Sequence, residues 1–402
     1  MWLLRKHPLP FLLGLAALAV LLSSRWLPGQ VASQAAARDT TFRTLPALVL
    51  SNDKLDLTVL PLGGAMASLV LKDDPEQLNP MWDALRAAQE EGRDVRGGGS
   101  VGHFICVDGF GPVSAEEREA GLPGHGEAHT LPWTTDSASK QSGVTSLVQS
   151  VEMPVVQESF TRTIRIVDGE NVVYVHGELT SLLSFDRPIN WAEHATIGSP
   201  FLEPGVTVVD MSPNRAMTRP YQADSRRPSR RRLASGVEFK WPMAPLVSGE
   251  LVDLRAGPTT LGSTDHTGHL MTPSGDRAWV TALHPAKRLL LGYMYNTSEF
   301  PWMQTWESYP EGRMLARGLE FGTQTFDLSR RQMISEGERF GTPLFRWLPA
   351  KSTIEATFLM FLVRTPEGFQ GVDRIEIRDG ALTIEDRRSG QSISLAASLA
   401  DE

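Results

Sequence analysis

Two short stretches of the sequence set a histidine or a carboxylate in surroundings that suit acid–base chemistry. In INWAEHATIGSPFLEPG, Glu193 and His194 follow a tryptophan and precede a Gly-Ser-Pro turn. An imidazole exchanges protons near neutral pH, as general acid catalysis requires. In ARGLEFGTQTF, Glu320 lies between Leu319 and Phe321, and apolar neighbours can raise the pKa of a carboxyl group toward the pH at which a general base works. On an alternating strand Glu320 could equally face solvent.

Two further stretches carry histidines at spacings that metal sites also use. His125 and His129 in GHGEAH would share one side of a helix and could bind zinc. The glycines and prolines around them disfavour a helix, so a loop that presents a histidine as a hydrogen-bond donor fits better. Loop histidines that only cap turns fit equally well. In GSTDHTGHL, Asp265, His266 and His269 could bind metal, although a turn-forming aspartate followed by exposed histidines is more common.

Aromatic residues offer a possible face for a sugar ring. Trp302 and Trp306 in FPWMQTWESY flank Gln304 and could stack on a sugar, although core positions are the commoner fate of tryptophan. The stretch VRGGGSVGHFICVDGFGP, continued to Trp133, is rich in glycine and histidine and shows little periodicity. We therefore interpret residues 95–133 as a loop-rich segment that displays binding groups, rather than mainly as a core element.

Two strong catalytic signatures are absent from the sequence. It contains no GxxxxGK phosphate loop and no HExxH motif. The single cysteine, Cys106, excludes an internal disulfide and a cysteine-based zinc site. The formal net charge of −8 argues against a nucleic-acid partner, because phosphate binding depends on clustered Lys and Arg.

The elements that must position these residues are mostly short strands. The clearest is a hairpin, SFTRTIRIVDGENVVYVHGELTSLL, with a favoured turn pair at Asp168 and Gly169. A short helix is expected within residues 81–91, and the tail from Arg374 reads as two further hairpins. Many short strands with Gly and Pro between them indicate an all-β fold, a large antiparallel β-sandwich with few short helices.

The N-terminus has the pattern of an export signal. A basic start, RKH, precedes an apolar run over residues 9–22, and three alanines stand at 35–37. We expect residues 1–37 to be a signal peptide or a membrane anchor, and residues 39–402 to form one domain. The protein is then exported, periplasmic or extracellular, and touches a membrane only through the N-terminal segment if that segment stays uncleaved.

Taken in order, these motifs resemble the aldose 1-epimerase (galactose mutarotase) superfamily. SNDKLDLTVLPLGG looks like the family's first strands and glycine turn. VRGGGSVGHFICVDGFGP followed by LPGHGEAHTLPW resembles the hexose-phosphate epimerase branch, in which an Arg-Gly-Gly, an aromatic-Gly-Pro and a His-Gly occur in that order. The resemblance implies the galactose mutarotase-like supersandwich and a small-molecule carbohydrate as substrate, with no metal and no other cofactor.

The resemblance also implies a role for each matching residue. Glu320 would be the general base on the anomeric hydroxyl, and His194 would protonate the ring oxygen. His125, Arg96 and Asp265 would bind and position the sugar. The expected activity is interconversion of sugar anomers by ring opening.

Two departures from the family's pattern concern specificity. His129 stands where the phosphate-sugar branch usually has an arginine, which argues against a phosphorylated substrate and makes His129 a possible substrate-binding residue, as are the two tryptophans. Glu193 precedes His194 where true mutarotases have asparagine, which argues against galactose. Two alternatives stay open: a noncatalytic carbohydrate-binding protein on the same fold, and a polysaccharide-processing enzyme on a related sandwich.

Overall fold

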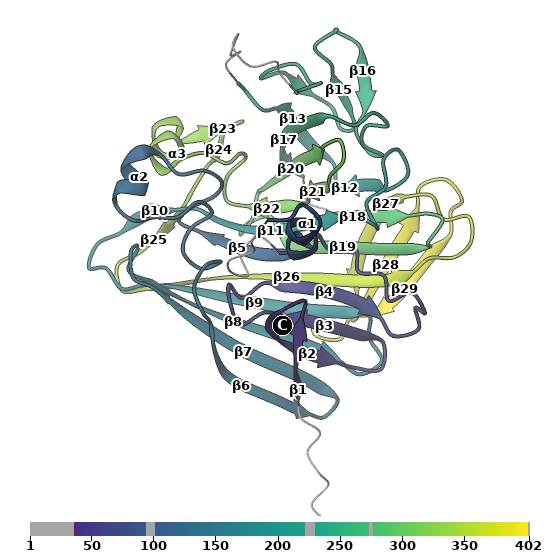
Figure 1. Cartoon of the computed structure of the whole chain (residues 1–402), viewed down its shortest axis with the longest axis horizontal. Helices are drawn as coiled ribbons and strands as arrows, with labels where there is room; N and C mark the ends of the chain where they lie inside the picture. The colour runs from purple at the N-terminus through teal and green to yellow at the C-terminus, as the bar shows by residue number, and fades with distance from the viewer. Residues whose placement is uncertain (1–35, 94–100, 222–229, 273–275, 401–402) are drawn as a thin grey trace, which may run out of the picture. The chain divides into compact units, whose positions relative to one another are not determined.

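The computed structural model describes residues 36–93, 101–221, 230–272 and 276–400. Within these residues every pair of neighbouring strands is antiparallel, and the helices are short: α1 (Ala84–Glu90), α2 (Ala115–Glu119) and α3 (Arg330–Glu336). The predicted all-β, antiparallel architecture is confirmed (Figure 1).

The strands near the motifs belong to a twelve-stranded sheet, as far as the chain is described. Its order is β1-β2-β3-β4-β5-β11-β21-β20-β17-β13-β14, and β22 pairs with β11 and β20. The strands are β1 (Ala37–Phe42), β2 (Leu45–Ser51), β3 (Leu55–Val59), β4 (Met66–Leu71), β5 (His103–Val107), β11 (Trp191–Gly198), β13 (Asn214–Thr218), β14 (Glu238–Phe239), β17 (Ser263–Met271), β20 (Trp302–Tyr309), β21 (Ala316–Gly318) and β22 (Glu320–Gly322).

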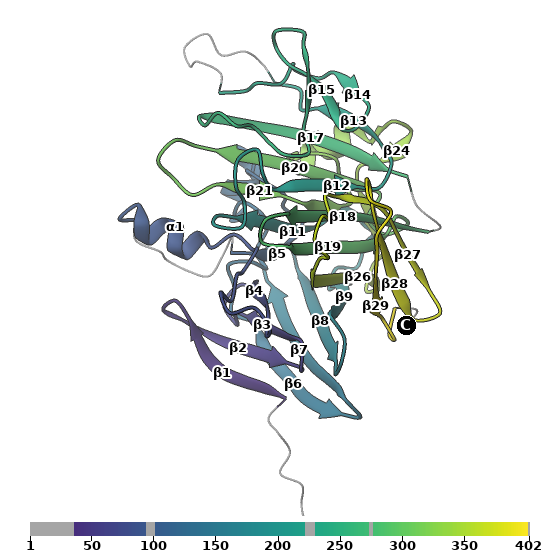
Figure 2. The same cartoon turned by 90° about the vertical axis from the view of Figure 1, so that its right-hand side faces the viewer.

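An eight-stranded sheet packs against it, and smaller sheets complete the described part. The larger one has the order β12-β18-β19-β26-β9-β8-β7-β6, and Figure 2 shows β2 and β3 lying across β7 and β8. Its strands are β6 (Thr134–Gln141), β7 (Val144–Met153), β8 (Glu158–Val167), β9 (Val172–Ser181), β12 (Val208–Met211), β18 (Arg277–His284), β19 (Leu289–Asn296) and β26 (Thr353–Arg364). The smaller sheets are β10 (Arg187–Ile189) with β25 (Arg346–Leu348), β15 (Met243–Pro245) with β16 (Leu251–Asp253), β23 (Glu338–Arg339) with β24 (Thr342–Pro343), and β27 (Val372–Arg378) with β28 (Ala381–Asp386) and β29 (Ser392–Ala396).

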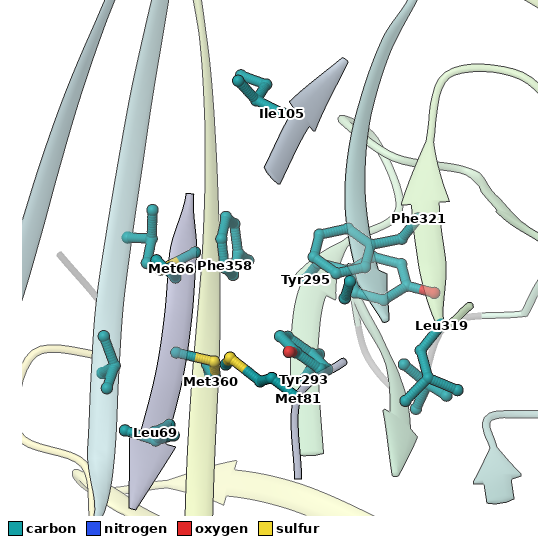
Figure 3. Packing of buried hydrophobic residues seen from close by; sticks show 14 of the residues in the cluster. Met66, Leu69, Met81, Ile105, Tyr293, Tyr295, Leu319, Phe321, Phe358 and Met360 are labelled. Carbon is teal, nitrogen blue, oxygen red and sulfur yellow. The ribbon is translucent and has the colours of Figure 1, made fainter. Parts of the chain in front are cut away.

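The main core fills the space between the two large sheets. Met66 and Leu69 of β4 face Phe358 and Met360 of β26, and all four are fully or almost fully buried (Figure 3). Strand β8 alternates strictly between buried and half-buried positions, as expected of a sheet with one face on the core. Burying apolar surface at roughly 25 cal/mol per Å² makes this core the dominant stabilising element.

The predicted hairpins are confirmed because local turn chemistry determines them. Strands β8 and β9 meet at Asp168 and Gly169, where Gly169 has φ +88°. Strands β27, β28 and β29 form a three-stranded sheet, and Ile375, Leu382 and other apolar side chains on it join a cluster that contains Trp279 of β18. The tail therefore has its own small sheet, packed on the eight-stranded one.

The stretch 95–133, interpreted as a loop-rich segment rather than mainly a core element, includes one core strand within its described residues, 101–133. Strand β5 lies in the middle of the twelve-stranded sheet between β4 and β11, and all of its residues are buried. A strand covered on both faces shows no alternation of apolar and polar residues, so HFICV gave no periodic signal. The segment supplies a central strand as well as loops.

All but the last two residues of the predicted N-terminal segment, 1–37, lie outside the described residues. Residues 1–35 are not described, so export and cleavage stay predictions. Among the described helices, none has the length and apolar character needed to cross a membrane.

Candidate active site

The twelve-stranded sheet brings the predicted acid and base together on one face. Partners in an antiparallel register share a face: Gln304 of β20 lies opposite Glu320 of β22, and Phe104 of β5 lies opposite His194 of β11. Because β22 also pairs with β11, the side chains of Phe104, His194, Glu320 and Gln304 form one row across four strands, called the acid–base row below. The result is a distance of 3.4 Å between His194 Nε2 and Glu320 Oε1.

The carboxyl group of Glu320 is buried in a setting that disfavours its charge. The residue is 2% exposed, and Gln304 Nε2 donates a 2.8 Å hydrogen bond to Oε2. Burial, with a smaller contribution from Asp327, raises the pKa of Glu320 to about 8, although the bond from Gln304 opposes the shift. The side chain folds back over Gly318, where a Cβ would overlap the carboxylate. Glycine at this position is therefore a condition for the observed placement.

The imidazole of His194 is held on two sides. Its ring stacks on Phe104 with centroids 4.3 Å apart and planes 19° apart, and Nδ1 lies 3.0 Å from Thr196 Oγ1. Burial, followed by the nearby His125, lowers the pKa of His194 well below its ordinary value. Because burial disfavours charge on both Glu320 and His194, the pair is neutral overall near pH 7 and holds one acidic proton between its two groups.

The loop that carries His125 and His129 lies beside this pair. The predicted loop is confirmed: residues 124–129 form no helix, and His125 has φ +64°. Its ring centroid lies 5.1 Å from that of His194 and 5.9 Å from that of His129. Burial lowers the pKa of both loop histidines to about 4, so they are neutral at pH 7. The N–H of Gly111 donates to His125 Nδ1 at 3.2 Å, which leaves Nε2 as the protonated donor nitrogen.

Asp265 does not join the group. Its register partner is Glu307, whereas Gly268 is opposite Gln304, so Asp265 faces the other side of β17 from the acid–base row. There it is 2% exposed and accepts hydrogen bonds from Arg232 Nε at 2.8 Å and from the main-chain N–H groups of Arg232 and Leu233 at 3.0 and 3.1 Å. Its neighbour His266 takes the face expected of Asp265. Asp265 thus lies on the opposite face of the sheet from the row, in a buried contact with Arg232.

The other predicted site residues, Trp302, Trp306 and Arg96, differ in where they lie. Trp302 is on the same face of β20 as Gln304 but is fully buried: its Nε1 donates to the Pro343 carbonyl oxygen at 2.9 Å, and its ring packs in a small apolar cluster with Met333 and Leu344. Trp306 is half-buried on the same face as Gln304, edge-to-face with Trp82 at 6.2 Å between ring centroids. Arg96 lies outside the described residues. Both tryptophans therefore lie on the face of the row, but only the side chain of Trp306 is partly exposed there.

Sequence reasoning missed the residues that hold the pair in place. Gln304, Phe104 and Thr196 all contact Glu320 or His194. Glu193, by contrast, faces the space between the sheets, where its carboxylate accepts from His103 Nε2 at 2.8 Å and Trp191 Nε1 at 3.0 Å. The only signal that could have found Gln304 was strand pairing with the segment around Glu320, which a single sequence does not display.

The comparisons with known proteins address the fold. No protein-family model matches the chain, and no curated protein sequence matches it either. Among solved structures, a putative aldose 1-epimerase from Klebsiella pneumoniae is similar over 80% of each chain, with a TM-score of 0.56 and 14% identity. A galactose mutarotase-like protein from Clostridium acetobutylicum matches 82% of this chain and 99% of its own, with a TM-score of 0.56 and 11% identity.

This chain has the galactose mutarotase-like fold. A putative aldose 1-epimerase from Escherichia coli K12 gives the same result, with a TM-score of 0.52 and 12% identity over 79% of this chain and 98% of its own. At such identities the likeness concerns the mutarotase-like fold alone.

Proposed function

We propose that the protein is an aldose 1-epimerase-like enzyme that interconverts the anomers of a free sugar. The observation that carries the proposal is the 3.4 Å contact between Glu320 and His194, two buried groups of which one can accept and one can donate a proton. Ring opening of an aldose needs these two functions at adjacent oxygens, the anomeric hydroxyl and the ring oxygen. The mutarotase-like fold supports the same assignment.

The chemistry follows from the single proton that the pair holds. Transfer of that proton from Glu320 to His194 gives a carboxylate and an imidazolium without changing the total charge of the pair. The carboxylate then takes the proton of the C1 hydroxyl while the imidazolium gives its proton to the ring oxygen, and the C1–O5 bond breaks. Rotation about C1–C2 and reclosure by the reverse transfers yield the other anomer. General acid–base steps of this kind each contribute roughly a hundredfold or more.

Neighbouring side chains would position the sugar. His125 offers an Nε2–H donor beside His194 because its Nδ1 is already an acceptor. His129 lies next to His125 and contributes to the choice of substrate, and Trp306 provides an aromatic surface two residues along β20 from Gln304. The sequence pattern at residues 1–37 adds export to the proposal. The protein would then be periplasmic or extracellular.

The test is polarimetry on freshly dissolved pure anomers of a panel of aldoses, with the spontaneous rate subtracted. The wild type is compared with Glu320→Gln and His194→Ala. Glu203→Gln is the matched control, because Glu203 pairs with His284 Nε2 at 3.1 Å at an exposed position. The proposal predicts acceleration of at least one sugar by the wild type and the control, and its loss in both site variants.

Two outcomes contradict the proposal. If the wild type accelerates no sugar while calorimetry detects binding that the site variants weaken, the protein is a noncatalytic carbohydrate-binding protein. If the site variants are as fast as the wild type, the pair is not the catalytic group.

A further inference from the structure

A second cluster of potential ligand groups lies on the outer face of the eight-stranded sheet. His176 and Glu178 are two residues apart on β9 and so project from the same face. Glu355 of β26 is the register partner of Glu178. These three side chains therefore converge at one place on two neighbouring strands, with no loop involved in setting their positions.

The distances match what a metal ion needs. One ligand atom from each side chain lies within 4.8 Å of the other two, and His176 Nε2 is 3.9 Å from Glu355 Oε2. Zinc bonds to nitrogen and oxygen of about 2.0–2.2 Å place tetrahedral ligands about 3.4 Å apart. Small side-chain rotations close the difference, and the side chains of His176 and Glu355 are 35% and 61% exposed, which leaves them free to rotate.

The charges of the cluster favour a cation. Glu178 and Glu355 are directly opposite each other, and like charges in such a cross-strand pair are destabilising. Arg346 lies close by, and its guanidinium donates to the main-chain oxygen of Glu355 at 2.9 Å. A dication bound between the two carboxylates would remove their repulsion directly.

A cavity beside the cluster supplies an independent reason to expect a ligand. About 210 Å³ in volume, it lies on the same sheet, and His176 and Thr357 are among its lining residues together with Tyr174, Met294 and Asn296. Because His176 belongs both to the cavity and to the cluster, an ion bound there would lie at the cavity's rim. Three protein ligands leave at least one coordination position for water or for a small molecule in the cavity.

We propose that His176, Glu178 and Glu355 bind a divalent transition-metal ion, separately from the acid–base row. An imidazole with two carboxylates suits zinc and the neighbouring first-row metals better than magnesium, which prefers an all-oxygen set. Among the described residues, this is the group of three whose ligand atoms come close enough together.

The experiment is isothermal titration of ZnCl₂ into the untagged full chain after chelator treatment, with MgCl₂ as the comparison ion. The proposal predicts one zinc ion per chain, no comparable heat from magnesium, and affinity at least about tenfold weaker in His176→Ala and in Glu355→Gln. Glu203→Gln, the exposed glutamate paired with His284, and His194→Ala, at the acid–base row, are the controls and retain the wild-type affinity.

Thermal unfolding provides a second measurement. Zinc should raise the unfolding temperature of the wild type and leave that of His176→Ala unchanged, because only the folded cluster binds the ion. In chelator the two proteins should unfold alike, since the substituted side chain is partly exposed. The proposal is overturned if the wild type binds no zinc, if His176→Ala binds it equally well, or if only His194→Ala loses it.

Discussion

The carboxylate of Glu320 rests over Gly318, where any side chain would occupy its place. Gly318→Ala should therefore displace Glu320 from His194, and we expect the rate of anomer interconversion to fall by tenfold or more, in line with a misplaced catalytic group. Polarimetry checks the rate, and thermal unfolding checks that the variant is folded. A folded Gly318→Ala protein with the wild-type rate would contradict the placement.

The pH dependence of activity should follow the protonation of the pair. The pair works with one acidic proton. Glu320 holds this proton until the pH approaches its raised pKa of about 8. Activity is therefore expected to fall as the pH rises through about 8. The pH–rate profile, corrected for the spontaneous rate at each pH, checks this expectation. An activity that keeps rising through pH 9 would contradict it.

Substitution of Gln304 should shift the pH at which activity falls. Its hydrogen bond to Glu320 lowers the carboxyl pKa, so Gln304→Met should raise the pKa further and shift the alkaline limb of the profile to higher pH. A merely structural role would lower the rate at every pH without shifting the limb. A shift toward lower pH would show that the bond does not act on the carboxylate.

The same raised pKa predicts a stability difference between wild type and Glu320→Gln. Below the ordinary value of 4.5 the carboxyl group is protonated in both the folded and the unfolded chain. As the pH rises from there toward about 8, only the unfolded chain loses the proton, so the wild type loses stability relative to the variant. The slope is about 1.4 kcal/mol per pH unit at most. Denaturant unfolding of both proteins measures the difference, and a pH-independent difference would refute the shift.

Asp265 should behave as a structural residue. Arg232 bridges Asp265 and Glu307, at 2.8 Å and 2.7 Å, and both carboxylates are almost fully buried. Asp265→Ala removes one partner of a buried ion pair, which typically costs about 3 kcal/mol. Urea unfolding should show the loss, while the KM for sugar stays near the wild-type value in the folded fraction. Unchanged stability with a strongly raised KM would restore the sugar-binding role.

The face on which Asp265 lies could not be predicted from the sequence. Along a strand, a shift of one residue moves a side chain to the other face, and His266 occupies the face that was expected of Asp265. The motif placed the segment correctly beside the row, but it did not determine which of the two neighbours lies on the same face of the sheet as Gln304 and Glu320.

Features that depend on local sequence could be predicted, whereas those that depend on long-range pairing could not. The hairpin at Asp168 and Gly169 follows from turn chemistry. Strand β5 was missed because burial on both faces removes alternation. His194 and Glu320 were chosen by the order of motifs, while their contact depends on pairing β11 with β22, far apart in the sequence. Such long-range register leaves no mark on a single sequence.

A double-mutant cycle tests the central claim most directly, that His194 and Glu320 act as one proton-sharing pair. The anomer interconversion rate is measured by exchange NMR for the wild type, Glu320→Gln, His194→Ala and the double variant. Residues that act as a unit give strongly non-additive losses, so the account predicts that the double variant is no slower than the slower single variant. Losses that multiply in the double variant, or single variants as fast as the wild type, would contradict it.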